Sequence, residues 1–499
     1  MGVFRSTPTP PPPSLPQEPV TLTGHKARNS TSAIVIKAMG LFGSMQALTI
    51  LCGIVRVKCV ALLLGTTGVG LFGIFNSAQL LLATTQLNLR YSAVRDIAQA
   101  SSSGTLNDAI HTVRRWGWLL GSAGVIITLL SAPLFSLYTF GDLSSTPQFM
   151  LLAIAILLMA ANSGEQAIMQ GTNRLKPLAL SSAWGVVAGL AAAIPLIYFL
   201  RMRSIVPVVI SYAVTQYIAI LCLRQTPTRP TPALSLRQLW VKGGPILRLG
   251  IYMTIAAILK EVMNYVFIAY LNCTGGTEEV GLYQSGYTVV VRYMGVIFSA
   301  VTMEFYTRLA SSNPHPHRQI VALRHELLLL TGIITPLLVI FIPFSPLAIR
   351  LLYSSEFLGV TPYMFCALPG MLLHALPLCI SYLILARGDG RTYVATETTI
   401  AILSLIFNIT GYRLGGLTGL GIAFTASHAA YSIIMLWVYL RNCHGTIPLR
   451  LTAIYILAIT AVTATSVACM HVFLMIYHPE GYTPFLFFSF SVSLPDFLY

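Results

Sequence analysis

The sequence predicts an all-α polytopic membrane protein. It further predicts two six-helix bundles related by a pseudo-two-fold axis along the membrane normal, plus one or two extra C-terminal helices. Three observations lead to this fold class. Of 499 residues, 55% are apolar and only 9% are charged, whereas soluble domains carry about 25% charged residues. Apolar stretches long enough to span a membrane recur along the chain. A glycine-rich turn occurs twice, 211 positions apart, at Val69 and at Val280.

The elements follow in order from these apolar stretches. Residues 1–31 are polar and proline-rich and contain no apolar signal segment, so we expect a disordered cytoplasmic tail. The apolar piece 485–494 is too short to span, and is either interfacial or the remnant of a fourteenth helix. Strands are not favoured, because the apolar runs are continuous rather than alternating. The predicted helices are 34–64, 69–89, 117–138, 148–170, 177–200, 205–223, 247–271, 280–304, 327–349, 361–386, 393–412, 417–440 and 451–477.

The basic residues predict the orientation. With a cytoplasmic N-terminus, 22 of the 30 basic residues fall on the inner side of this layout and four on the outer side. Such a bias is typical of cytoplasmic loops. It explains the net charge of +15 without a nucleic-acid partner. The eight cysteines are scattered without a CxxC pair, so we expect no metal and no cofactor.

The repeated turn predicts two halves. Val69-Gly70-Leu71-Phe72 and Val280-Gly281-Leu282-Tyr283 each begin a helix after an outer turn. Six helices per half is an even number, so both halves enter the membrane in the same direction and suit alternating access. The predicted parts are a tail at 1–31, an N-terminal lobe at 32–224, a cytoplasmic linker at 225–246, a C-terminal lobe at 247–441 and the extra helix or helices at 442–499.

Four cations are not explained by topology: Arg56, Lys58, Lys260 and Arg292. A cation within the membrane costs about 2.5–3.5 kcal/mol on insertion scales, so it is expected to face a polar cavity. Snorkelling to the interface explains Lys58 best, because it works near helix ends. Arg56, Lys260 and Arg292 are therefore candidates for binding an anionic substrate.

Uncharged and acidic groups complete the candidate site. Glu261 is the central acid and a candidate for ion coupling, although it could instead only neutralise a cation. It lies beside Lys260, and neighbouring residues diverge by about 100° around a helix. Asn76 and Asn264 are candidates for hydrogen bonds to a sugar or a phosphate, with ordinary interhelical bonding as the alternative.

The segments 52–65, 68–75 and 92–100 resemble the start of the multidrug/oligosaccharidyl-lipid/polysaccharide exporter superfamily, and specifically its Wzx-type O-antigen and polysaccharide flippases. The related lipid II flippases have an arginine in helix one that projects into a cationic central cavity. The resemblance implies this role for Arg56, and more loosely a similar role for Arg292. The sequence departs from that pattern at Val57, which replaces an acid, and lacks a basic residue in the middle of helix two.

The resemblance implies a flippase that moves an undecaprenyl-pyrophosphate-linked oligosaccharide across the bacterial inner membrane for lipopolysaccharide or another surface polysaccharide. Its partners would be this lipid-linked oligosaccharide, membrane lipids, and the polymerase and glycosyltransferases of the same process. A cation-coupled multidrug exporter of the same superfamily is the alternative, but it would favour buried acids over arginines. A membrane enzyme of glycan assembly is the third interpretation. It lacks support, because no GxxxxGK[ST] or HExxH motif occurs.

Overall fold

The computed structural model describes residues 24–103, 105–224, 236–298, 305, 309, 316–387, 389–442 and 448–477. The ordered elements in this part of the chain are helical, and no strand occurs in it, which confirms the all-α prediction. The helices are α1 (Gly24–Ala83), α2 (Leu89–Ser103), α3 (Leu106–Phe140), α4 (Thr146–Gly171), α5 (Leu175–Leu200), α6 (Ile205–Leu223), α7 (Leu236–Tyr287), α9 (Pro316–Leu352), α10 (Thr361–Ala386), α11 (Gly390–Asn442) and α12 (Leu449–Tyr477). Short 3₁₀ segments are η1 (Thr84–Gln86), η2 (Arg201–Ser204) and η4 (Ser355–Val360), and the π-helical segment η3 is Thr288–Tyr293.

Glycine kinks divide the three longest helices. Gly65 in α1 and Gly276 in α7 have φ values of 65° and 80°, a left-handed conformation that costs glycine nothing. In α11 the break lies at Gly415 and Gly416. Each kink coincides with a break between two predicted helices. Ten described helical stretches are long and apolar enough to span a membrane, and three of them contain these kinks.

Several boundaries differ from the prediction. Helix α1 begins at Gly24, so residues 24–31 are helical rather than part of a disordered tail. No proline occurs between Pro19 and the end of α1 at Ala83, so nothing in this segment prevents the helix from beginning that early. Helix α7 begins at Leu236, inside the predicted linker. Helix α2 was not predicted, because it is short and polar, but Ala93 and Ile97 are fully buried on one of its faces. Residues 1–23, 225–235 and 485–494 lie outside the described part, so the remaining tail, the rest of the linker and a fourteenth helix stay predictions.

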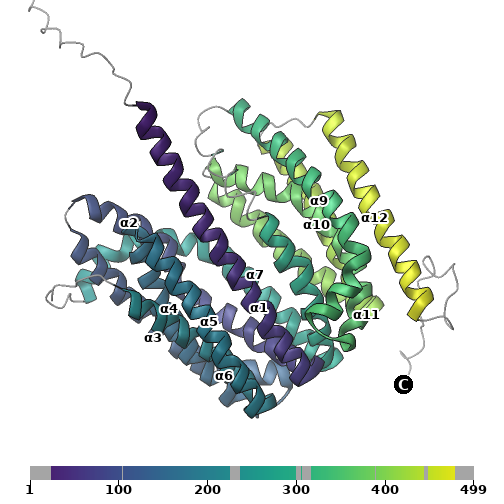
Figure 1. Cartoon of the computed structure of the whole chain (residues 1–499), viewed down its shortest axis with the longest axis horizontal. Coiled ribbons are helices and arrows are strands. Elements are labelled where there is room, and N and C mark those ends of the chain that lie inside the picture. The colour runs from purple at the N-terminus through teal and green to yellow at the C-terminus, as the bar shows by residue number, and fades with distance from the viewer. Residues whose placement is uncertain are drawn as a thin grey trace, which may run out of the picture.

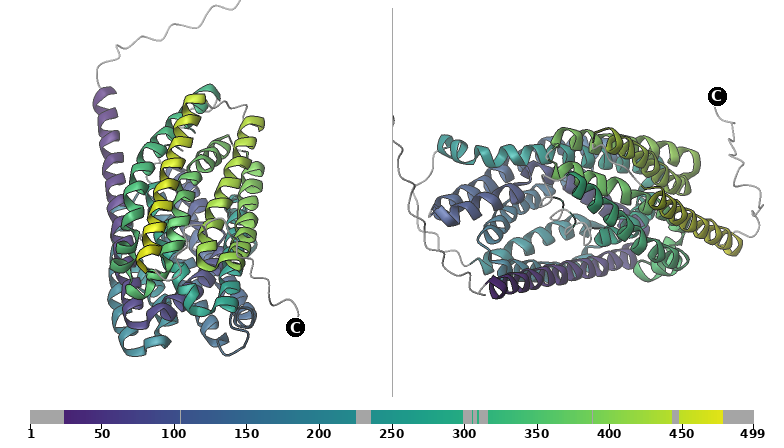
Figure 2. Two further views of the ribbon diagram at one scale, coloured as in Figure 1. Left: turned by 90° about the vertical axis from the view of Figure 1, so that its right-hand side faces the viewer. Right: turned by 90° about the horizontal axis from the view of Figure 1, so that it is seen from above.

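The helices form two groups. Figure 1 shows α1 to α6, in purple to teal, beside α9 to α12, in green and yellow, and the view from above in Figure 2 shows the same division. We call the first group the N lobe and the second, with α7, the C lobe. In the N lobe α3 packs against α4, and α5 against α6; in the C lobe α10 packs against α9 and α11. Helix α12 packs on α9 and α10 as the extra C-terminal helix.

The two lobes meet where the repeated turns lie. A Cβ atom added to Gly70 would stand 1.9 Å from the carbonyl oxygen of Thr277, and one added to Gly281 would stand 2.0 Å from that of Thr66. The two contacts are reciprocal, because both partners are displaced by the same 211 positions, as a pseudo-two-fold axis requires. The Thr66 hydroxyl also donates to Glu278 Oε1 across this contact, at 3.1 Å. We call this pair of contacts the glycine junction; it holds α1 and α7 together at the predicted outer side.

The opposite end of the N lobe carries a buried ion cluster. Glu165 of α4 accepts hydrogen bonds from Arg114 of α3 at 2.5 and 3.1 Å, and from Arg224 at the end of α6 at 3.5 Å. The Glu165 residue is 4% exposed. Removing one partner of such a cluster strands a buried charge, which typically costs about 3–5 kcal/mol. The cluster therefore fastens three helices of one lobe to each other.

Candidate functional site

Arg56 lies nine residues before the Gly65 kink and is held by two aromatic rings. Its guanidinium carbon is 5.2 Å from the ring centre of Phe72, beyond the kink, and 5.1 Å from that of Tyr212 on α6. Its Nε atom is buried and makes no hydrogen bond. Among the described side chains no carboxylate forms an ion pair with it. Both rings stabilise the cation by cation–π contact, and the unpaired Nε–H could donate to an anion.

Arg292 lies in the π-helical segment η3, which continues α7. A π segment interrupts the regular helix and is frequent at functional sites. The Arg292 side chain is exposed, and its charge interacts electrostatically with that of Arg56. We call these two arginines, one from each lobe, the cation pair.

Lys260 and Glu261 diverge, as their positions on one helix predict. Lys260 lines a cavity in the C lobe. Glu261 is half-buried and interacts electrostatically with both Lys260 and Arg292. No ion pair within 4 Å involves Glu261 among the described residues. Unlike Lys260, Glu261 does not line the cavity.

The two predicted asparagines lie in different lobes. Asn264 follows Lys260 by about one turn of α7 and lines the same C-lobe cavity. Asn76 lies about one turn after Phe72 in α1. Of the predicted site residues, Lys260 and Asn264 line the C-lobe cavity, whereas Arg56, Arg292 and Asn76 do not.

The C-lobe cavity has a volume of about 370 Å³ and lies between α7, η3, α10 and α11. Its wall includes residues that the sequence analysis did not select: His374, Glu397, Ser404, Asn408 and His428. Glu397, Ser404 and Asn408 follow one another at intervals of seven and four residues. That spacing places them on one face of an otherwise apolar helix, and this polar stripe was the signal that could have found them.

Comparison with protein families matches residues 73–362, more than half of the chain, to the family described as polysaccharide biosynthesis protein. No curated protein sequence gives a significant match. Solved structures share the fold at low sequence identity. An inward-facing multidrug resistance MATE family transporter of the MOP superfamily is 13% identical with a TM-score of 0.69, covering 81% of this chain and 95% of that one.

Two further structures agree on the fold. The lipid II flippase MurJ in an inward closed conformation is 14% identical with a TM-score of 0.66, covering 87% of this chain and 99% of that one. An outward-facing MATE family transporter is 15% identical with a TM-score of 0.55, covering 84% and 96%. These likenesses confirm the predicted resemblance to the exporter superfamily at the level of the fold. The chain belongs to the polysaccharide biosynthesis protein family and has the two-lobe fold of the MOP superfamily.

Proposed function

We propose that this protein is a flippase that moves an undecaprenyl-pyrophosphate-linked oligosaccharide across the bacterial inner membrane by alternating access. The observation that carries the proposal is the cation pair. Two arginines from opposite lobes interact electrostatically, and no described carboxylate forms an ion pair with either. Two arginines are suited to a pyrophosphate because each guanidinium donates several N–H groups in a planar fork. The match to a polysaccharide biosynthesis family supports a glycan as the cargo.

The glycine junction supports alternating access. It brings α1 and α7 into close contact at the predicted outer side, and a state open to that side would have to break this contact. Moving cargo outward requires the junction to part while the inner ends approach. A rigid-body rocking of two similar lobes achieves both changes around a fixed site.

The proposal is tested by translocation in vesicles. Purified protein is reconstituted into liposomes that contain a fluorescent undecaprenyl-pyrophosphate-linked sugar, and an impermeant quencher is added outside. Protein-containing vesicles should lose the protected inner-leaflet pool of the lipid much faster than empty ones. Equal rates in both vesicle types would remove the flippase proposal.

A cation-coupled multidrug exporter is the second candidate. It is favoured by the carboxylate of Glu397 in an aromatic-lined cavity of the C lobe, because organic cations bind to acids and aromatic faces. The same vesicles separate the two functions. Extrusion of ethidium under an imposed proton gradient, without lipid translocation, would favour the exporter.

The orientation is a separate prediction, drawn from the basic residues. Ser144, in the turn between α3 and α4, should face outward, and Arg391, at the start of α11, should face the cytoplasm. Both residues are exposed. Cysteine placed at Ser144 should react with an impermeant maleimide in intact cells, whereas cysteine at Arg391 should react only after lysis. The exposed native Cys222 and Cys273 are replaced by serine as background. The reverse pattern would overturn the orientation.

Energy coupling is assigned to Glu261 as a further prediction. Glu261 interacts electrostatically with Lys260 and Arg292. Protonation of its carboxylate would remove a negative charge that interacts with both cations. Glu261→Gln should fold normally, lose transport driven by a pH step across the vesicle membrane, and keep slow downhill exchange. Glu356→Gln, which changes an exposed acid of η4, is the control and should respond to the pH step as wild type. A normal response of Glu261→Gln would exclude this residue as the coupling site.

A further inference from the structure

The C-lobe cavity is built from matching helix faces of a single lobe. Along α11 its wall is formed by residues 397, 400, 401, 404, 405 and 408, which share one face of the helix. The polar stripe from Glu397 to Asn408 extends over about 16 Å of helix. A volume of 370 Å³ falls within the range of small-molecule sites, about 300–1,000 Å³. The cavity is therefore large and long enough for a ligand of its own.

The polar groups of the wall have unused hydrogen-bonding capacity. Asn264, Ser404 and Asn408 make no side-chain hydrogen bond to another described residue, although amides within a membrane normally find partners. The Nδ1 atom of His374 is buried and also lacks a partner. The wall thus offers amide, hydroxyl and imidazole groups that the protein itself does not satisfy.

Two other polar groups of the wall are oriented by the protein. His428 Nδ1 lies 2.9 Å from the carbonyl oxygen of Phe424; a carbonyl only accepts, so Nδ1 donates and leaves Nε2 of the neutral ring as an acceptor. Glu397 Oε1 accepts hydrogen bonds from Ser381 and Tyr431, each at 3.4 Å. These contacts fix the donors and acceptors before any ligand arrives.

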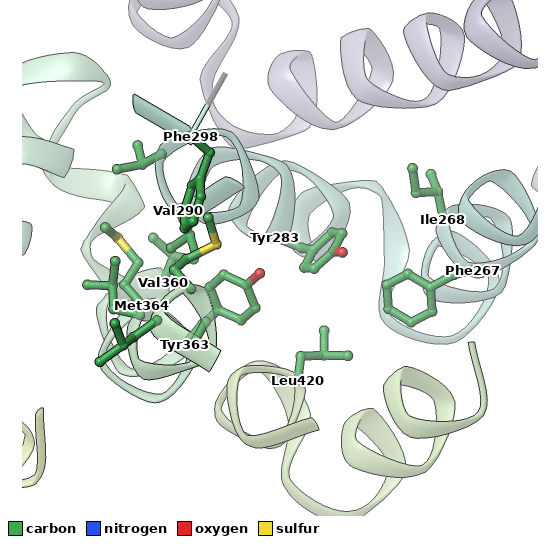
Figure 3. Packing of buried hydrophobic residues seen from close by; sticks show 14 of the residues in the cluster. Phe267, Ile268, Tyr283, Val290, Phe298, Val360, Tyr363, Met364 and Leu420 are labelled. Carbon is green, nitrogen blue, oxygen red and sulfur yellow. The ribbon is translucent and has the colours of Figure 1, made fainter. Parts of the chain in front are cut away.

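Aromatic rings form part of the remaining wall. Phe267 and Tyr283 meet edge to face with their ring centres 5.3 Å apart, and Figure 3 shows both among the buried hydrophobic residues of this region. Phe298 and Phe424 also line the cavity. Aromatic faces beside amide and hydroxyl groups suit a ring with apolar C–H faces and a polar edge, which is the chemistry of a sugar. A prenyl tail would leave the amides unpaired, and a pyrophosphate would be repelled by Glu397.

The cavity and the cation pair share η3 as a wall. Val291 lines the cavity, while the next residue, Arg292, belongs to the cation pair. Lys260 also lines the cavity and interacts electrostatically with Glu261, which in turn interacts with Arg292. In a lipid-linked oligosaccharide the first sugar is joined directly to the pyrophosphate. A pyrophosphate at the cation pair therefore brings that sugar to the edge of the cavity.

We infer that the C-lobe cavity is the glycan subsite, which binds the sugar residues nearest the pyrophosphate, while the cation pair binds the pyrophosphate itself. The inference rests on the proposed function. It assigns glycan selectivity to the polar stripe of α11 and leaves the lipid tail outside the cavity.

Binding to the purified full-length protein in nanodiscs tests the subsite. The two probes are the lipid-linked oligosaccharide fraction extracted from the source cells, and undecaprenyl pyrophosphate. Wild type should bind the oligosaccharide fraction about tenfold more tightly. Ser404→Phe fills the cavity and should reduce this affinity to that of undecaprenyl pyrophosphate, which itself should not change. Ile402→Phe adds the same ring on the exposed face of α11, and should bind both probes as wild type does.

The outcomes separate the two levels of the proposal. Equal loss of both probes in Ser404→Phe, or no change in either, would overturn the glycan subsite and leave the flippase standing. Binding of neither probe by wild type would overturn both. Asn408→Ala, which removes an amide without adding volume, should lower the affinity for the oligosaccharide fraction alone and guards against a folding defect in Ser404→Phe. The free glycan, released from the fraction by mild acid, should compete with the lipid-linked oligosaccharide for binding to wild type but not to Ser404→Phe. If ethidium competes and the free glycan does not, the assignment of the cavity to a glycan is overturned.

Discussion

Alanine at Arg56 or at Arg292 should abolish translocation while the protein remains inserted and abundant. Each change removes a guanidinium that would donate hydrogen bonds to the pyrophosphate. Within the membrane, water does not replace these hydrogen bonds. Truncating one partner of a buried charged contact typically costs about 2–5 kcal/mol. Translocation in vesicles should therefore fall by roughly 30-fold or more.

Conservative and distant substitutions show whether the loss is specific. Arg56→Lys keeps the charge but loses the planar fork and part of the stacking between Phe72 and Tyr212, so partial activity is expected. Arg350→Ala removes an exposed arginine at the end of α9 and should leave translocation intact. Full activity of both Arg56→Ala and Arg292→Ala would remove the cation pair from the mechanism.

Valine at Gly70 should prevent the lobes from closing at the outer side. The added Cβ atom would stand 1.9 Å from the Thr277 carbonyl oxygen, and this oxygen belongs to backbone that cannot move aside alone. Overpacking of this kind costs about 1–3 kcal/mol, and here the cost falls on the closed outer junction. Translocation should be lost, and cysteine at Thr66, which is 8% exposed, should become reactive to an impermeant maleimide from outside.

The reciprocal geometry supplies a second test of the junction. Gly281→Val should give the same two effects, because its Cβ atom would meet Thr66 in the equivalent way. Gly53→Val, in the same helix as Gly70 but with no atom within 4 Å of the new Cβ, is the matched control. Unchanged labelling of the Thr66 cysteine in both junction variants would show that the outer ends are not held closed by these glycines.

Most of the fold could be predicted because a bilayer imposes strong rules on the sequence. Apolar stretches predicted the spanning helices. The glycine-rich turns predicted the breaks near Gly65 and Gly276, where the backbone adopts a positive φ. The unpredicted helix α2 shows the limit of this reasoning. Its stability comes from burying Ala93 and Ile97 against neighbouring helices, and a count of apolar residues in a short polar segment does not reveal that packing.

The candidate site could be predicted only in part. The free-energy cost of placing a cation within the membrane singled out Arg56 and Arg292 as candidates. It could not reveal the rings around Arg56, because Tyr212 comes from a helix more than 150 positions away. The helical angle between Lys260 and Glu261 correctly implied different surroundings for the two. The C-lobe cavity was not predicted, since uncharged residues such as Ser404 and Asn408 carry little cost and are common as interhelical contacts. Their spacing along α11 places them on one face of the helix, but the sequence does not show that α7 and α10 stand opposite that face.

The ion cluster around Glu165 has a mechanical consequence. It fastens α3, α4 and α6 at their ends far from the glycine junction, so the N lobe resists internal bending. The C lobe contains more interior prolines: α9 has three and α10 two, against one each in α3 and α5. Each proline removes a backbone hydrogen bond, and η3 adds a π segment to the C lobe. The two lobes should therefore differ in stiffness, with the N lobe the more rigid and the C lobe the more easily bent. Elastic strain would then collect in η3, the segment that carries Arg292.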